Sequence, residues 1–198
     1  MTGESLRDRQ RAQIRADIRR AAFRLFVERG YDAVTTEEIA TAAGVSARTF
    51  FRHVPAKEEL LLAPVRYGGA AIVNLLEGRP ADESPDVALI NAIITRTRSF
   101  EQADTEEWRE ALLVVPDLLD KVTVHRPADK ERATKLIAER MGVDPDADLR
   151  PGLLVQLAFA AADFAFQQWV RQSGKPRPLD RYVADALDAV KSPHWRRK

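Results

Sequence analysis

Apolar residues along this chain recur with the period of an α-helix rather than that of a strand. In the first such segment, arginines step along a second face at every fourth position from Arg11 to Arg19. An amphipathic helix over 9–29 is therefore predicted, and Gly30 is the residue type that ends a helix in the left-handed conformation. The apolar face of this helix consists of Ile14, Ile18, Ala21, Ala22, Leu25 and Phe26.

Helical periodicity continues along the chain, interrupted by short stretches rich in glycine and proline. No segment alternates like a strand and no internal repeat is present, so the predicted fold class is all-α. Pro55 ends one helix, and Pro64 interrupts the next because proline cannot donate to the Leu60 carbonyl. Further helices are predicted at 36–43, 47–53, 57–76, 86–103, 105–114, 116–123, 128–141, 153–170 and 179–191.

Two short predicted helices around Gly44 carry the signals of a helix-turn-helix. Thr35, with Glu38 three residues later, forms a capping box that starts the first helix. Gly44 can take the positive φ that a sharp turn requires, and Ser46 can cap the second helix. A helix–glycine–helix unit can serve packing alone, but the caps and the polar second helix favour DNA reading.

The second of these helices is predicted to lie in the major groove with its early residues at the base edges. Arg48 can make a bidentate contact to guanine, and Thr49 can reach a base or a phosphate. Ala47 and Phe51 can contact a thymine methyl group, while Thr36, His53 and Lys57 are candidates for phosphate contacts. The predicted DNA-binding residues are Thr36, Ser46, Ala47, Arg48, Thr49, Phe51, His53 and Lys57.

Charge is unevenly distributed, although the formal net charge is only +1. Residues 1–57 carry eleven basic and seven acidic residues, a net charge of +4, whereas residues 58–198 carry 20 basic and 23 acidic residues, a net charge of −3. A basic N-terminal quarter is typical of a segment that meets a polyanion, although charge alone fits a solvated helix equally well. The predicted domains are a DNA-binding domain over 9–56 and a helical ligand-binding and dimerisation domain over 57–192.

A series of short motifs occupies residues 9–62: Ala22-Phe23-Arg24-Leu25-Phe26, Gly30-Tyr31, Val34-Thr35-Thr36, Ile39-Ala40, Ala43-Gly44-Val45-Ser46, Thr49-Phe50-Phe51-Arg52-His53 and Pro55-Ala56-Lys57-Glu58-Glu59-Leu60-Leu61. This block resembles the DNA-binding half of the TetR family of repressors. The resemblance implies a three-helix DNA-binding domain and a divergent helical domain that dimerises and often binds a small effector. Phe51 departs from the tyrosine of many members, which removes a phenol contact to phosphate. Val54 and Ala56 replace an aromatic residue and a capping residue, so the next helix is expected to be less firmly capped.

Two C-terminal segments have the composition of a helix-pair interface. Residues 153–170 are apolar almost all round and rich in alanine, and a helix that is apolar on every side must be buried on every side. These segments resemble the last two long helices of the TetR family, which form a four-helix bundle in the dimer. A homodimer through 152–171 and 179–191 is therefore expected, and a monomer core is the alternative.

The resemblance also implies an effector pocket among the middle helices, although aromatic residues there fit a core equally well. Residues 138–169 resemble the C-terminal domain of mycofactocin-type TetR regulators, a subgroup that responds to fatty acyl-thioesters, so a small apolar or amphipathic effector is expected. Arg96, Arg98, His125 and Asp163 are expected on exposed faces. The candidate effector-binding residues are Phe100, Trp108, Leu112, Phe164 and Gln167, with Trp169 as a further lining candidate.

Several other classes of function are disfavoured. The chain has no cysteine, its three histidines lie in no ligand or nucleophile motif, and it has no glycine-rich phosphate loop. Neither a metal, a cofactor nor an enzymatic activity is expected. Since no apolar run reaches ~18 residues and the first twenty residues are polar, a cytoplasmic protein without a membrane partner is expected.

These patterns predict a DNA-binding transcriptional regulator, a repressor whose dimer binds a palindromic operator and is released by a small-molecule effector. In this mechanism the ligand moves the helix that connects the two domains. Pro64 lies in that helix, either as part of a hinge or as a bend that follows the core. The alternative function is an effector-independent DNA-binding regulator controlled by a protein partner.

Overall fold

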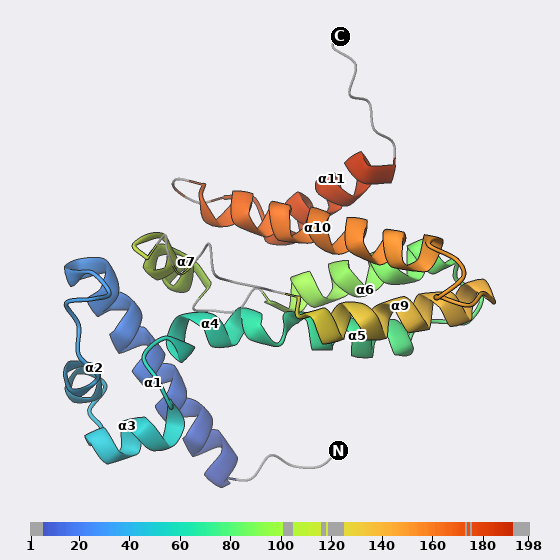
Figure 1. Cartoon of the computed structure of the whole chain (residues 1–198). Helices are drawn as coiled ribbons and strands as arrows, with labels where there is room; N and C mark the ends of the chain where they lie inside the picture. The colour runs from blue at the N-terminus through green and yellow to red at the C-terminus, as the bar shows by residue number, and fades with distance from the viewer. Residues whose placement is uncertain are drawn as a thin grey trace. The chain divides into compact units, whose positions relative to one another are not determined.

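The computed structural model describes residues 6–100, 105–115, 118, 125–172, 174 and 176–191, with the backbone alone for Phe100 and Lys191. Within these ranges every regular element is an α-helix, which confirms the predicted all-α class (Figure 1). The helices are α1 (Leu6–Arg29), α2 (Thr36–Ala42), α3 (Ala47–His53), α4 (Glu59–Arg66), α5 (Gly68–Glu77), α6 (Pro85–Phe100), α7 (Thr105–Leu113), α9 (Pro127–Met141), α10 (Arg150–Val170) and α11 (Leu179–Lys191).

The predicted helix over 57–76 is the one that differs most from the structure. It is divided into α4 and α5, and Tyr67 lies between them with φ −100° and ψ 9°. Pro64 lies inside α4, and the break follows three residues later. α3 and α11 have the predicted bounds, whereas the helix predicted at 116–123 falls almost entirely outside the described residues.

The chain divides into two compact units. The first consists of Met1–Pro64 and Ala103–Val122, and the second of Val65–Gln102 and Thr123–Lys198. α7 belongs to the first unit because it packs on α1. The predicted domains 9–56 and 57–192 stay a prediction. The first compact unit does not end at that boundary, because it also includes residues 103–122.

The first unit is built on α1, which contacts α2, α3 and α7. Its apolar side begins at Ile18, so the turns of α1 that precede this residue bury no side chain. On α7, the indole Nε1 of Trp108 donates a hydrogen bond of 2.9 Å to the carbonyl of Leu61. The core of this unit includes Ile18, Phe23, Phe26, Ile39, Phe50, Leu61, Trp108 and Leu112.

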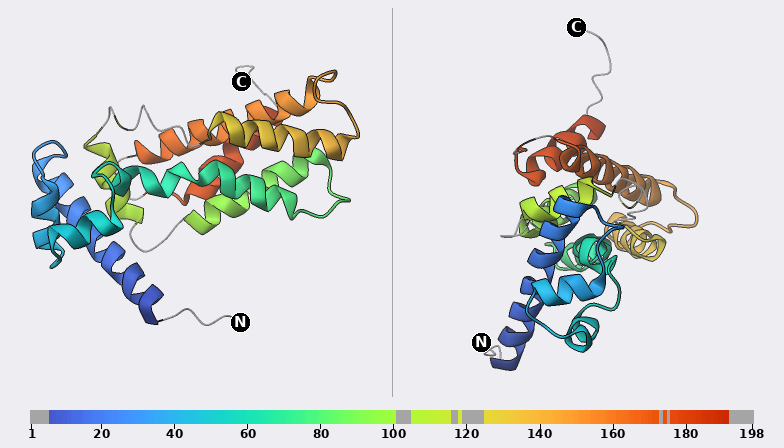
Figure 2. Two further views of the ribbon diagram at one scale, coloured as in Figure 1. Left: turned by 60° about the horizontal axis from the view of Figure 1, so that its bottom comes forward. Right: turned by 90° about the vertical axis from the view of Figure 1, so that its left-hand side faces the viewer.

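In the second unit α5, α6 and α9 lie side by side, and α10 and α11 pack against them (Figures 1 and 2). Small residues allow α10 to approach its neighbours closely, because Ala158, Ala162 and Ala165 are all buried. Arg98 on α6 forms an ion pair of 3.0 Å with Asp180 on α11. The core of this unit includes Ile72, Val73, Leu76, Leu89, Ile93, Ile137, Val155, Phe159, Trp169, Val183 and Leu187.

Two stretches of helix, Glu59–Glu77 and Arg150–Val170, are long and apolar enough to cross a membrane by length and composition alone, although no membrane-spanning segment was expected from the sequence. Core helices of soluble proteins share this property, and 44% and 50% of the two stretches are buried inside the protein. Packing within each unit therefore accounts for much of their apolar character.

Gly69, in the first turn of α5, lies directly against the carboxylate of Asp129. A Cβ on Gly69 would lie 2.6 Å from Asp129 Oδ2 and 3.0 Å from its Cβ and Cγ atoms. Arg126 holds that buried carboxylate with hydrogen bonds of 3.1 and 3.3 Å, so it has little room to move. We expect Gly69→Ala to lower the free energy of unfolding by about 1–3 kcal/mol, as measured by urea denaturation.

Gly152→Ala on α10 is the matched control. Its added Cβ would meet only Thr134 Cγ2, at an ordinary 3.9 Å. Since alanine favours a helix over glycine by about 1 kcal/mol, this variant should be as stable as the wild type or more stable. Equal stability of the two variants would show that the contact between Gly69 and Asp129 relaxes without cost.

Candidate nucleic-acid interface

Hydrogen bonds at their first turns define where α2 and α3 begin. The backbone N–H of Thr35 donates to Glu38 Oε2 over 2.8 Å, and that of Glu38 donates to Thr35 Oγ1 over 3.2 Å, which forms the predicted capping box. Gly44 adopts φ +68°, a conformation that few other residues take readily. Ser46 Oγ then accepts a hydrogen bond of 3.1 Å from the backbone of Thr49. These contacts determine where the two helices begin.

α3 buries one side and exposes the other. Phe50 is fully buried, and its ring meets that of Phe51 edge-on, with centroids 5.4 Å apart. Phe51 remains half exposed, and Ala47 and Arg48 are exposed beside it. The predicted base-contacting residues thus share the exposed face of α3, and the buried face of the same helix packs in the core.

The remaining polar candidates lie at the starts of the two helices. Ser46 Oγ also donates to Thr49 Oγ1 over 3.0 Å, so both hydroxyls lie together in the first turn of α3. Thr36 begins α2, where its hydroxyl donates to Glu37 Oε2 over 3.0 Å. The structure therefore places Thr36 near one helix start and Ser46 and Thr49 at the other, the positions from which phosphate contacts are usual.

His53 was expected to hold a phosphate, but its Nε2 atom is buried and has no hydrogen-bond partner among the described residues. The pKa of His53 is lowered, first by burial and then by the positive charges of Arg52, Arg15 and Arg11. An inward, neutral Nε2 atom argues against the predicted phosphate contact through this atom. The same interactions show that the arginines of α1 lie beside the end of α3.

Lys57 has an internal role that the sequence did not predict. Its Nζ donates to the carbonyls of Tyr31 and Val34 over 2.8 and 2.9 Å, and it lies 4.1 Å from the centre of the Tyr31 ring. Burial raises the pKa of Tyr31 to about 12, so the phenol stays neutral. Lys57 therefore fixes the loop between α1 and α2, and a phosphate would share an ammonium that is already hydrogen-bonded.

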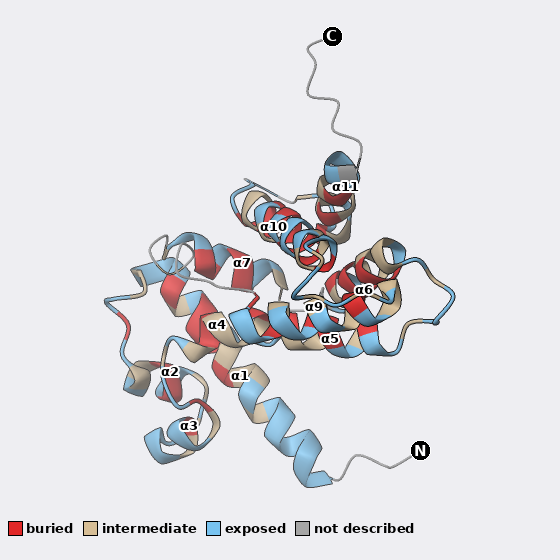
Figure 3. Cartoon of the chain, turned by 45° about the vertical axis from the view of Figure 1, so that its right-hand side comes forward, coloured by how far each residue is buried: buried red, intermediate tan, exposed pale blue. Residues whose placement is uncertain are grey.

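A basic surface that sequence reasoning did not assign to the site runs from α3 onto α1. It comprises Arg52 on α3 and Arg7, Arg11 and Arg15 on α1, spaced four residues apart and all exposed. Figure 3 shows the first turns of α1 as an exposed segment. Within the described parts of the chain, none of these four arginines forms an ion pair. A polyanion along this surface would supply the missing negative charge.

The candidate effector-binding residues are divided between the two compact units. Trp108 and Leu112 are buried in the core of the first unit, whereas Phe164 and Gln167 belong to the second. Phe164 is 61% exposed and lies on the outside of α10. Trp169 is a core residue, and the side chain of Phe100 lies outside the described part of the structure.

Comparison with known proteins identifies the class to which this architecture belongs. Residues 18–63 match the family described as bacterial regulatory proteins, tetR family, and residues 83–194 match the MftR C-terminal domain. The chain belongs to the TetR family of DNA-binding transcriptional regulators, which are not enzymes.

Individual relatives extend over nearly the whole chain. The HTH-type transcriptional regulator TcmR of Streptomyces glaucescens is 32% identical over 207 residues, covering 98% of this chain and 92% of that protein. The mycofactocin biosynthesis transcriptional regulator MftR of Mycobacterium tuberculosis is 25% identical and covers 96% of both chains. The structure of FadR, a fatty acid degradation regulator from Bacillus halodurans, shares the fold with a TM-score of 0.55 at 18% identity, over 92% of this chain and 97% of that one.

The capping box predicts how the stability of the DNA-binding unit depends on pH. The Thr35 backbone hydrogen bond, followed by the hydrogen bond from Arg29, lowers the pKa of Glu38 from 4.5 to about 2. A carboxylate with a lowered pKa stabilises the folded state above pH 4.5, and this contribution is lost as the pH falls towards 2. We expect Glu38→Gln to lower the Tm at neutral pH and the difference from wild type to shrink on acidification.

Glu37→Gln, one residue earlier in the same turn, is the control because Glu37 does not cap the helix. Its Tm difference from wild type should be smaller at neutral pH. A constant difference between wild type and Glu38→Gln from neutral to acidic pH would contradict the assigned role of the Glu38 charge.

Proposed function

We propose that this chain is a cytoplasmic, dimeric repressor that binds a palindromic operator through α3 and is released by a small-molecule effector. The observation that carries the DNA-reading role is the outer face of α3. This helix contains no acidic residue, and Arg48 and Arg52 are exposed on it without an ion pair among the described residues. Base reading by Arg48 and phosphate contacts by the neighbouring arginines fit this arrangement.

Dimerisation is supported by an unpartnered apolar stripe on α10. Leu153, Leu157, Ala160 and Phe164 follow one another at spacings of four, three and four residues, so they share one face of the helix. All four are exposed, and the three large ones are 58%, 44% and 61% exposed. The opposite side of α10 is already packed in the core. A second copy of the chain, packing α10 and α11 as TetR regulators do, would cover this stripe.

Phe164→Glu should therefore disrupt the dimer. The carboxylate would lie at the centre of a helix-pair interface, where a buried unpaired charge is strongly unfavourable. Analytical ultracentrifugation should show a dimer for the wild type and a monomer for the variant at the same concentration. Val87→Glu on α6 is the control, since Val87 is also an exposed apolar residue, at 38%, and lies outside the stripe. A dimer that persists in Phe164→Glu would rule out α10 as the interface.

Effector release requires a ligand that binds the two states of the dimer with different affinity. The boundary between the compact units falls at Pro64–Val65, inside α4, so a change in one unit can pass to the other through this helix. The match of residues 83–194 to the MftR C-terminal domain supports a sensing role for this region. Control by a protein partner is the alternative, and ligand-dependent release of operator DNA separates the two.

DNA selection tests the function as a whole. Fragments of genomic DNA that bind the purified chain should contain an inverted repeat, with half-sites spaced by about one turn of 34–36 Å or a multiple of it. Arg48→Ala should relax one base position in each half-site and cost about 1–3 kcal/mol on the matched operator. Arg11→Ala should weaken all sequences alike and reduce the salt dependence of log K by about 1.

These two variants distinguish a base contact by Arg48 from a phosphate contact by Arg11. Full operator affinity for Arg48→Ala would contradict the base contact. An unchanged salt dependence for Arg11→Ala would contradict phosphate binding by α1. Recovery of random fragments that are lost at modest salt would leave only nonspecific phosphate binding and would overturn the operator-reading function.

A further inference from the structure

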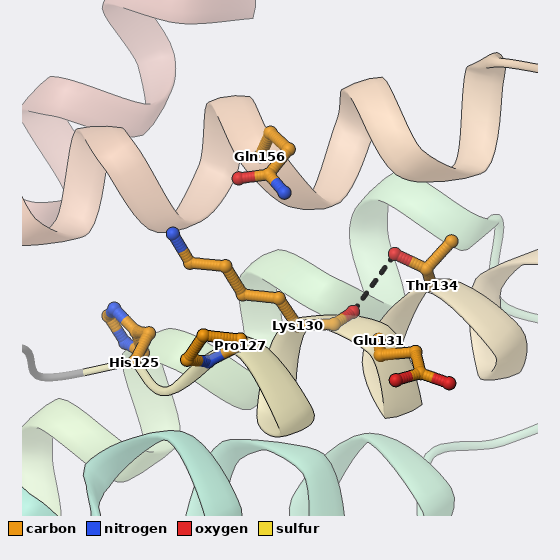
Figure 4. A pocket seen from close by; sticks show the side chains of 6 residues that line it. All are labelled: His125, Pro127, Lys130, Glu131, Thr134 and Gln156. Carbon is orange, nitrogen blue, oxygen red and sulfur yellow. Dashed lines mark hydrogen bonds between the residues drawn. The ribbon is translucent and has the colours of Figure 1, made fainter.

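A groove of about 520 Å³ lies between α9 and α10 in the second unit, away from the residues considered so far. Its volume is within the range of small-molecule pockets in proteins. Figure 4 shows side chains reaching into it from both helices and from the residues just before α9. The lining residues are His125, Pro127, Lys130, Glu131, Thr134 and Gln156.

His125 forms one end of this groove. Only 3% of the residue is exposed, contrary to the exposed position expected from the sequence. Its Nδ1 lies 2.8 Å from Asp163 Oδ1 on α10, and its ring stacks on Phe159 with centroids 4.2 Å apart and planes at 20°. Because Nδ1 faces Asp163, Nε2 is the ring nitrogen that can serve a ligand.

Lys130 supplies a positive charge inside the groove. Its side chain extends from α9 towards α10, between His125 and Gln156 (Figure 4). It is half-buried, and among the described residues no carboxylate lies within ion-pair distance of it. The acidic residue of the groove, Glu131, is instead paired with Lys135 over 2.7 Å. A partly desolvated ammonium without a counter-charge is an attractive partner for an anion.

We propose that this groove binds the anionic end of an amphipathic carboxylate, which we identify with the effector in the proposed function. Lys130 holds the carboxylate, Gln156 donates a hydrogen bond from its amide, and Pro127 and the His125 ring face the apolar part. One unpaired cation matches a monoanion, whereas a phosphate dianion would meet a single lysine and the nearby Glu131. The site differs from the aromatic positions that the sequence suggested.

Ligand in this groove has a direct route to the dimer. On α10, Gln156 lines the groove and Asp163 lies next to His125, while Leu153, Leu157 and Phe164 form the exposed apolar stripe of the same helix. A molecule held between α9 and α10 changes the position of the same helix that packs on the second subunit. Carboxylate binding therefore shifts the dimer between operator-binding and released arrangements, to the extent that its affinity for them differs.

The test uses aryl and alkyl carboxylates, 1-naphthoate and decanoate, each paired with its uncharged methyl ester. Binding to the whole chain is measured by calorimetry for wild type, Lys130→Met, Lys130→Arg and Arg132→Met. Arg132 is the control because it lies on the same helix, has the same charge, is 51% exposed and pairs with Glu77 outside the groove. We expect acids to bind better than esters, Lys130→Met to weaken acid binding at least about tenfold, and Lys130→Arg and Arg132→Met to retain it.

Esters that bind as well as their acids, equal losses in Lys130→Met and Arg132→Met, or no binding of either acid would overturn the proposal. Operator binding by each variant is measured in parallel without ligand. If Lys130→Met still binds the operator, a failed carboxylate test rejects this site and leaves the DNA-binding function intact. If the wild type itself binds no operator, the proposed function fails independently of the groove.

Discussion

The helix-turn-helix of this regulator depends on the burial of one phenylalanine. A helix of seven residues such as α3 is not stable by itself, because too few hydrogen bonds offset the cost of nucleation. Phe50 is fully buried and anchors α3, while the Ser46 cap and the Gly44 turn determine where the helix begins. The outer face of α3 then needs no packing of its own, so its residues are available to DNA.

Local sequence signals predicted the helix-turn-helix well. The features that they missed depend on contacts between residues far apart in the sequence. The capping box of Thr35 and Glu38, the turn at Gly44 and the bounds of α3 all follow from residues within four positions of one another. Lys57 is different, because the carbonyls it binds belong to residues 26 and 23 positions earlier. Its sequence context at a helix start suggested a phosphate ligand, and only the folded loop reveals the internal hydrogen bonds.

The candidate effector site could not be predicted for a related reason. Aromatic residues in apolar helices were the natural sequence candidates, but Trp108 and Leu112 serve the core of one unit and Phe164 lies on the surface of the other. Apart from Pro127 the groove residues are polar, and they come from α10, α9 and the segment before it. Such a set of residues produces no periodic hydrophobic pattern in the sequence. His125 follows no helical pattern, and its burial depends on Phe159 and Asp163, more than thirty residues later.

The exposed stripe of α10 also bears on the stability of the protein at low concentration. A subunit alone leaves Leu153, Leu157 and Phe164 in contact with water. If association covers them, mass action makes the folded population depend on total protein concentration. Dilution then removes the regulator in two ways, by emptying the operator and by leaving single chains open to unfolding and proteolysis. The response of the regulated promoter to falling protein levels would be steeper than operator affinity alone predicts.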